Sequence, residues 1–128
     1  MALILIVDDD PVLTALAEDA LRQDGHQVLT AADGEEGLRR LRDAPVDLVV
    51  LDMLMPRKDG FETLMEIRRL RRGPRVLAIS GGGRSAPMNY LGPARTLGAD
   101  AIMEKPFSPP ALLQRVRELL ETEPALSP

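Results

Sequence analysis

The chain has 128 residues, of which 45% are hydrophobic, and this length and composition predict a single folded domain with an aliphatic core. Sixteen basic and twenty acidic residues give a net charge of −4, which provides no overall attraction to nucleic acid or to an anionic membrane. Cysteine is absent, so disulfides, thiolate metal sites and cysteine nucleophiles are excluded. Two Phe, one Tyr and no Trp leave too few rings for a stacking platform that binds single-stranded nucleic acid.

Short aliphatic runs alternate with amphipathic stretches along the chain, a pattern typical of β-α units around a parallel sheet. Nearly unbroken runs at residues 3–7, 46–51 and 75–79 predict central strands that helices cover on both faces. Weaker runs at 27–31 and 101–103 predict the two edge strands. The first run is too short to span a bilayer and leads directly into acidic residues, so we interpret it as a strand and not as a membrane or signal segment.

Apolar residues at helical spacing mark the stretches between the strands. The first helix is predicted between the start signal Asp10-Pro11 and Gly25, with a core-facing stripe of Leu13, Leu16, Ala17, Ala20 and Leu21. Further helices are predicted at about 34–43 and 61–70. The last helix follows Ser108-Pro109 and has a stripe of Leu112, Leu113, Val116, Leu119 and Leu120. Four methionines beside apolar runs are predicted to pack in the core: Met53, Met55, Met65 and Met103.

The stretch between residues 80 and 98 is the least regular part of the chain. Four glycines and two prolines precede Ala94, so we predict a long mobile loop, with a regular helix only near 93–97. Residues 122–128 are predicted to be a flexible tail, which leaves 1–121 as the domain.

Polar side chains follow four of the predicted strands. Asp8 and Asp9 follow the first strand, Asp52 the third and Ser80 the fourth, and Lys105 comes soon after the fifth. Because the carboxyl ends of parallel strands meet at one edge of a sheet, these side chains are expected to converge. Three carboxylates in one place repel one another unless a cation joins them, and oxygen ligands of this kind favour Mg²⁺ or Mn²⁺. A hydroxyl and an ammonium beside them would hold the oxygens of a phosphoryl group, and a carboxylate is a competent nucleophile toward its phosphorus.

These residues and their surroundings resemble the response-regulator receiver domain, the phospho-acceptor module of bacterial two-component signalling. The motifs that carry the resemblance are Leu5-Ile-Val-Asp-Asp-Asp-Pro11, Leu51-Asp-Met-Leu-Met-Pro-Arg-Lys-Asp-Gly60, Ser80 and Gly98-Ala-Asp-Ala-Ile-Met-Glu-Lys-Pro-Phe107. The resemblance covers essentially the whole chain. It implies a single flavodoxin-like α/β domain, a doubly wound five-stranded parallel sheet of order 2-1-3-4-5 with helices on both faces.

The resemblance also implies the role of each site residue. Asp52 would be the site of phosphorylation and would take its phosphoryl group from a phosphohistidine on a histidine kinase or a histidine phosphotransfer protein. Asp9 and Asp52 would bind Mg²⁺ or Mn²⁺ directly, Asp8 through water, and the backbone carbonyl of Leu54 would be a further ligand. Two side chains would contact the phosphoryl oxygens, those of Ser80 and Lys105. A cis Lys105-Pro106 bond would aim the lysine at the site.

The output side of the domain departs from the family pattern. Ile102 stands where receivers commonly have Tyr or Phe, so no ring is available there to report that Ser80 is engaged with phosphate. We hypothesise that the glycine-rich loop and the helix after it carry the signal to a downstream target protein. The residues assigned to this switch are Ile102, Pro106, Gly81, Gly82 and Tyr90. Neither Leu54 nor Gly82 has a side chain that positions water, which predicts slow self-dephosphorylation.

The function implied is that of a cytoplasmic switch in a phosphorelay. Such a domain catalyses its own phosphotransfer but is not a turnover enzyme, because Asp52 is consumed until the phosphoryl group is removed. No membrane contact and no direct nucleic-acid contact are expected of it. The alternative is an interaction module that keeps the fold and ignores phosphate. A phosphatase with an aspartyl intermediate would require a second acid where Leu54 stands.

Overall fold

The chain folds around one parallel β-sheet. The computed structural model describes residues 2–53, 60–70, 73–81 and 98–121. The strands are β1 (Leu3–Val7), β2 (Gln27–Ala31), β3 (Leu48–Asp52), β4 (Arg75–Gly81) and β5 (Ala101–Lys105). They pair in the order β2-β1-β3-β4-β5, and every pair is parallel. The predicted strand order is confirmed, with the two weaker runs at the edges.

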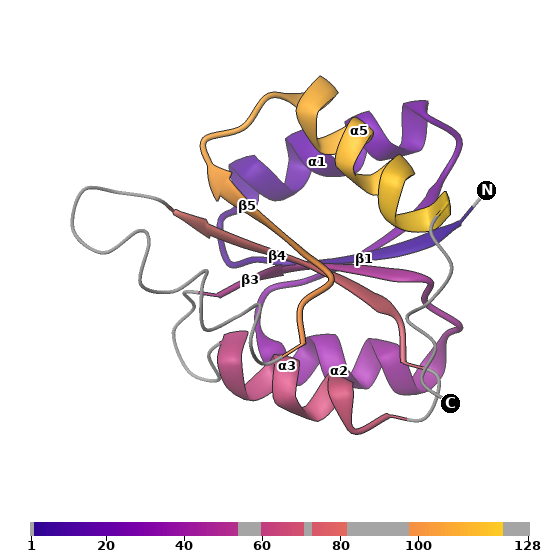
Figure 1. Cartoon of the computed structure of the whole chain (residues 1–128), viewed down its shortest axis with the longest axis vertical. Coiled ribbons are helices and arrows are strands. Elements are labelled where there is room, and N and C mark those ends of the chain that lie inside the picture. The colour runs from indigo at the N-terminus through magenta and orange to yellow at the C-terminus, as the bar shows by residue number, and fades with distance from the viewer. Residues whose placement is uncertain (1, 54–59, 71–72, 82–97, 122–128) are drawn as a thin grey trace.

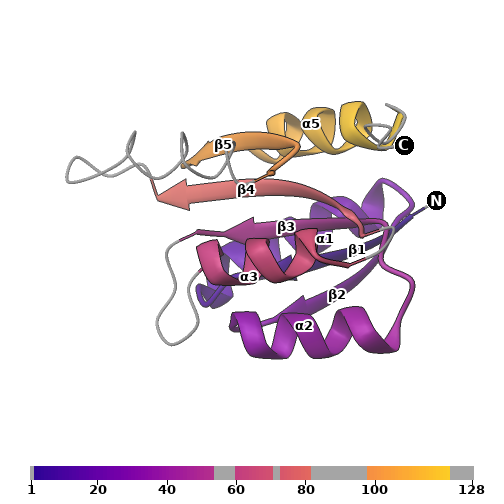
Figure 2. The same ribbon diagram turned by 60° about the horizontal axis from the view of Figure 1, so that its bottom comes forward.

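The described helices lie on both faces of the sheet (Figure 1). Helices α1 (Pro11–Gln23) and α5 (Pro109–Glu121) pack against each other on one face. Helices α2 (Gly34–Asp43) and α3 (Gly60–Arg68) do the same on the other, as the rotated view in Figure 2 also shows. No helix in these described ranges is both long and apolar enough to cross a bilayer. The short helix predicted near 93–97 and the tail predicted at 122–128 lie outside the described residues.

The core consists of two apolar layers separated by the sheet. Along β1, Ile4 and Ile6 face the layer under α1 and α5, whereas Leu5 and Val7 face the layer under α2 and α3. Successive side chains of a strand point to opposite faces, so a strand buried on both faces must be apolar throughout. This arrangement explains the unbroken aliphatic run at the start of the chain.

The strands extend further toward the polar rim than the apolar pattern predicts. β3 begins two residues later than expected and includes Asp52, β4 continues through Gly81, and β5 continues through Lys105. β4 and β5 are paired as far as Gly81↔Lys105. The paired strands therefore continue past the last apolar residue of each run. Consequently, four of the predicted site residues stand on the sheet itself and not on the loops after it: Asp52, Ser80, Gly81 and Lys105.

The predicted burial of two residues is wrong. Leu16 is 59% exposed and Met65 is 42% exposed. On α1 the buried positions are Ala17 and Leu21, and Leu16 lies on the adjoining solvent side, one turn after the exposed Val12. Because α1 shares its face of the sheet with α5, the buried stripe of the helix is narrower than its apolar stripe. Among the other methionines, Met53 is fully buried, Met103 packs partly buried against the core, and Met55 lies outside the described residues.

Candidate functional site

A cluster of carboxylates lies at the carboxyl end of the sheet. Asp8 follows β1 and is buried, Asp9 beside it is exposed, and Asp52 is the buried last residue of β3. One carboxylate oxygen from each of the three residues lies within 4.8 Å of the others. These aspartates lie together, as predicted, because β1 and β3 are neighbouring paired strands.

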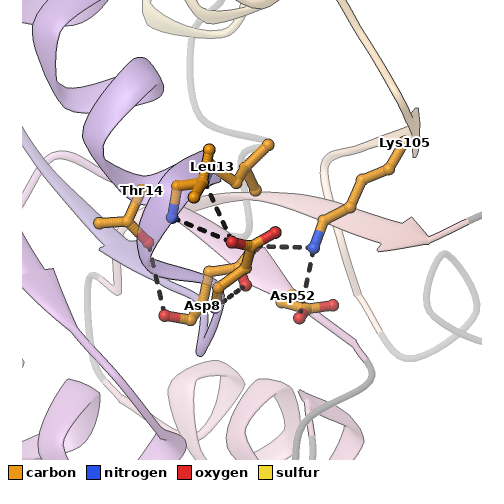
Figure 3. A network of polar contacts seen from close by, with 7 residues as sticks. Asp8, Leu13, Thr14, Asp52 and Lys105 are labelled. Atoms are coloured by element: carbon orange, nitrogen blue, oxygen red, sulfur yellow. Dashed lines mark hydrogen bonds and ion pairs between the residues drawn. The ribbon is translucent and has the colours of Figure 1, made fainter.

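The ammonium of Lys105 enters this cluster from the edge strand β5. Its Nζ lies 2.9 Å from Asp8 Oδ2 and 3.5 Å from Asp52 Oδ2 (Figure 3). Burial of the ammonium disfavours its charge, but the two carboxylates outweigh that cost and raise the pKa of Lys105 above its ordinary value of 10.5. Lys105 is therefore a permanent cation at neutral pH, and it bridges the ends of β1 and β3.

The orientation of Asp8 is fixed from two sides. Its Oδ1 accepts a hydrogen bond of 2.9 Å from the backbone N–H of Asp10, while Oδ2 faces Lys105. Asp10 in turn is the N-cap of α1 and accepts from the amides of Val12 and Leu13. The buried carboxylate is thus held by the start of one helix and the end of one strand.

Ser80 has the clearest sign of an incomplete site. Its side chain is fully buried, and Oγ has no hydrogen-bond partner in the part of the chain that the structure describes. The β3-β4 register pairs Asp52 with Ile79, so Ser80 stands at the strand end next to Asp52. A buried hydroxyl without a partner costs about 1 to 3 kcal/mol. Such a group suits a ligand that brings an acceptor oxygen to it.

The charge of the cluster also fits an added cation. Among the described residues, three carboxylates and one ammonium gather here, which is an excess of negative charge. The donors are all oxygen atoms, the ligand type that Mg²⁺ and Mn²⁺ prefer. Asp8, Asp9 and Asp52 are therefore suited to hold a divalent cation, with Lys105 and Ser80 beside it.

Comparison with known proteins settles the family. The family model described as "Response regulator receiver domain" matches residues 4–117. The chain belongs to this family. The flavodoxin-like fold predicted from the sequence agrees with solved members of it. A CheY-like receiver domain protein of Methanospirillum hungatei superposes with a TM-score of 0.84 at 30% identity, covering 94% of both chains. The receiver domain of NtrX from Brucella abortus gives a TM-score of 0.86 at 31% identity, covering 94% of this chain and 99% of that one.

Curated relatives of this receiver domain are longer proteins. The transcriptional regulatory protein CpxR of Klebsiella pneumoniae is 40% identical over 117 residues, which is 91% of this chain and 48% of CpxR. The alkaline phosphatase synthesis transcriptional regulatory protein PhoP of Bacillus subtilis is 34% identical over 125 residues, 98% of this chain and 51% of PhoP. The chain spans about half the length of the curated relatives that it matches. It is a phospho-accepting response regulator receiver, the class of protein that acts as a switch.

The predicted switch residues of the receiver domain have different outcomes. The Lys105-Pro106 peptide bond is cis, as predicted. Ile102 is partly buried and packs against the core layer under α2 and α3, so no aromatic ring occupies this position. Gly81 ends β4 and was expected in a loop, which the structure corrects. Three predicted residues lie outside the described ranges and stay predictions: Leu54, Gly82 and Tyr90.

The sequence reasoning did not find the part that Gly60 plays in the receiver domain. Gly60 begins α3, and a Cβ atom built on it would lie 2.5 Å from the carbonyl oxygen of Asp52 and against the backbone of Met53. The first turn of α3 therefore lies directly against the backbone of Asp52 and Met53. The only signal in the sequence was a glycine at the predicted start of a helix, which alone does not indicate a close backbone contact.

A Gly60→Ala variant is expected to lose about 1 to 3 kcal/mol of unfolding free energy, because the two atoms nearest to the added methyl group are backbone atoms of Met53 and Asp52. Urea denaturation measures this loss. Gly37→Ala on α2 is the matched control, since its added methyl group would meet a Val7 methyl group at 2.9 Å and not backbone, and it gains helix propensity. An equal loss in the two variants would show that the contact with Asp52 has no special cost.

Proposed function

We propose that Asp52 accepts a phosphoryl group from a phosphohistidine on a histidine kinase or phosphotransfer protein, in a reaction that requires Mg²⁺. Asp9 and Asp52 would bind the cation directly and Asp8 would hold it through water, and the backbone carbonyl of Leu54 would be a further ligand. The cation, when bound, neutralises charge on the phosphoryl oxygens. One observation carries the proposal: the buried hydroxyl of Ser80, which has no hydrogen-bond partner among the described residues, and the ammonium of Lys105 stand beside the same carboxylates.

The chemistry divides among the side chains in a simple way. An oxygen of the Asp52 carboxylate attacks the phosphorus, the bond from phosphorus to the histidine nitrogen breaks, and the nitrogen keeps that electron pair and gains a proton. Ser80 donates a hydrogen bond to one phosphoryl oxygen, and Lys105 provides positive charge to another. The raised pKa of Lys105 keeps that charge in place over the whole neutral range.

The test is the intact mass of the chain after incubation with acetyl phosphate, with and without Mg²⁺. A single phosphoryl adduct that forms only with the metal supports the proposal. No adduct under any condition, while a known receiver domain reacts in parallel, would favour the alternative of a phosphate-independent interaction module. The domain boundary at residue 121, the cytoplasmic location, the downstream target and the absence of nucleic-acid contact stay predictions.

The surface of α1 next to the rim supports a protein as the phosphoryl donor. Val12 and Leu16 are 67% and 59% exposed and lie one turn apart, on the helix that starts directly after the aspartates. A donor histidine must approach that rim, and exposed apolar side chains beside it favour contact with another protein. We therefore propose that the donor protein contacts this face of α1.

A Leu16→Glu variant is expected to accept phosphoryl groups about tenfold more slowly from a phosphorylated histidine-kinase core that is active on the wild-type chain, because a charge replaces an apolar contact. Its rate with acetyl phosphate stays within about twofold of the wild-type rate. Met65→Glu is the control, since Met65 is also exposed but lies on α3, on the opposite face of the sheet. Equal slowing by both variants, or slowing with acetyl phosphate, would contradict a donor contact on α1.

A further inference from the structure

Residue 10 is the meeting point of helix α1 and the aspartates after β1. Its backbone N–H donates to Asp8 Oδ1 at 2.9 Å. Its side-chain Oδ1 accepts from the amides of Val12 at 3.0 Å and Leu13 at 3.3 Å, and its carbonyl oxygen accepts from the amide of Thr14 at 3.0 Å. A single exposed residue therefore begins the hydrogen bonding of α1 and holds one oxygen of a buried carboxylate.

Asp10 both caps α1 and donates its backbone N–H to Asp8, and these two roles depend on each other. The first amides of a helix have no partner within the helix, and the side chain of the N-cap residue supplies one. Asp10 has the extended backbone conformation of an N-cap, with φ −89° and ψ 109°. When the cap is intact, the peptide that carries the N–H of residue 10 has one orientation. When the first turn frays, that N–H loses its fixed direction toward Asp8.

Among the described residues, the Asp8 carboxylate has few other contacts that could replace this one. Apart from the hydrogen bond from residue 10, its carboxylate faces the ammonium of Lys105 at 2.9 Å. Groups that orient a metal ligand from behind commonly change metal affinity by about 10- to 100-fold when they are removed. The geometry at residue 10 is of this kind, although it acts through a backbone amide.

We infer that Asp10 is a positioning residue that couples the first turn of α1 to the cation affinity of Asp8. The inference rests on the proposed cation site. Coupling between two sites is reciprocal, so a cation that Asp8 helps to hold, directly or through water, also stabilises the first turn of α1. Val12 lies in this first turn and Leu16 in the next. If a protein binds to these two side chains, the cation changes the affinity of that protein by some factor, and the protein changes the affinity of the cation by the same factor.

The first test separates the cap from the charge of Asp10. Asp10→Ser and Asp10→Ala remove the same negative charge, but only serine retains an oxygen that caps the helix. Titration calorimetry with Mg²⁺ is expected to give a dissociation constant about tenfold weaker for Asp10→Ala than for Asp10→Ser. Equal affinities in these two variants would overturn the inference, because the effect of Asp10 would then be one of charge alone.

The second test uses the wild-type chain and does not depend on the stability of a variant. Amide hydrogen exchange is measured at Val12 and Leu13 with and without Mg²⁺. The cation is expected to slow exchange at both amides about tenfold in the wild type, and to have no such effect in Asp10→Ala. Unchanged exchange in a wild-type chain that binds Mg²⁺ would overturn the coupling and leave the proposed function intact. A wild-type chain that binds no Mg²⁺ would overturn the cation site itself.

Discussion

An Asp52→Asn variant is expected to gain no phosphoryl group from acetyl phosphate under conditions that phosphorylate the wild-type chain. Asp52 is the buried carboxylate that lies within 3.5 Å of the Lys105 ammonium and next to the strand end that carries Ser80. An amide is nearly isosteric with the carboxylate but is not a nucleophile toward phosphorus. The folded structure is retained, because asparagine fills the same space and can still accept a hydrogen bond from Lys105.

The matched control for this variant is Asp43→Asn. Asp43 is an exposed carboxylate at the end of α2, so its replacement changes the net charge equally and leaves the rim intact. Intact-mass spectrometry should show the wild-type adduct on Asp43→Asn and none on Asp52→Asn. An adduct on Asp52→Asn that maps to Asp8 or Asp9 would move the acceptor to a neighbouring carboxylate.

An Asp9→Asn variant is expected to reverse the order of thermal stability between metal-free and Mg²⁺ conditions. With a chelator present, loss of one carboxylate relieves repulsion worth about 1 kcal/mol and raises the melting temperature by about 4 °C. With Mg²⁺ at about 100 times its dissociation constant, the wild type gains about 2.7 kcal/mol, and the variant gains much less because it lacks one ligand. The wild type then melts at the higher temperature.

Differential scanning calorimetry in the two buffers tests this reversal. Asp43→Asn should respond to Mg²⁺ as the wild type does, because Asp43 lies outside the cluster of three carboxylates. A variant Asp9→Asn that keeps the full Mg²⁺ response would show that Asp9 is not a ligand. A variant that is less stable than the wild type in the chelator would show that the three carboxylates do not repel one another as proposed.

The strand order and the identity of the rim residues could be predicted from the sequence because two simple rules act together. Runs such as residues 3–7 are apolar on both sides, which indicates strands between two layers of helices. Polar residues that directly follow such runs must meet at one end of a parallel sheet. Asp8 and Asp52 lie far apart in the chain, yet these rules place them together, as the structure confirms.

The remaining features depend on packing that local patterns do not describe. Leu16 is exposed because α1 and α5 share one face of the sheet. The spacing of apolar residues in α1 alone does not reveal that arrangement. The contact between Gly60 and the peptide of Asp52 is a tertiary approach of backbone to backbone. The extension of β5 to Lys105 comes from pairing with β4, because backbone hydrogen bonding is indifferent to the polarity of the side chains.

Lys105 comes from the last described strand in chain order and at one edge of the sheet, yet its ammonium reaches Asp8 after the first strand. The counter-charge of the carboxylate cluster therefore comes from the C-terminal β-α unit. During synthesis from the N-terminus, a chain that has not yet produced β5 has its aspartates but lacks the cation between them. Under the proposed function, a chain without β5 would lack the positive charge of Lys105 beside Asp52 and would accept a phosphoryl group more slowly than the complete domain.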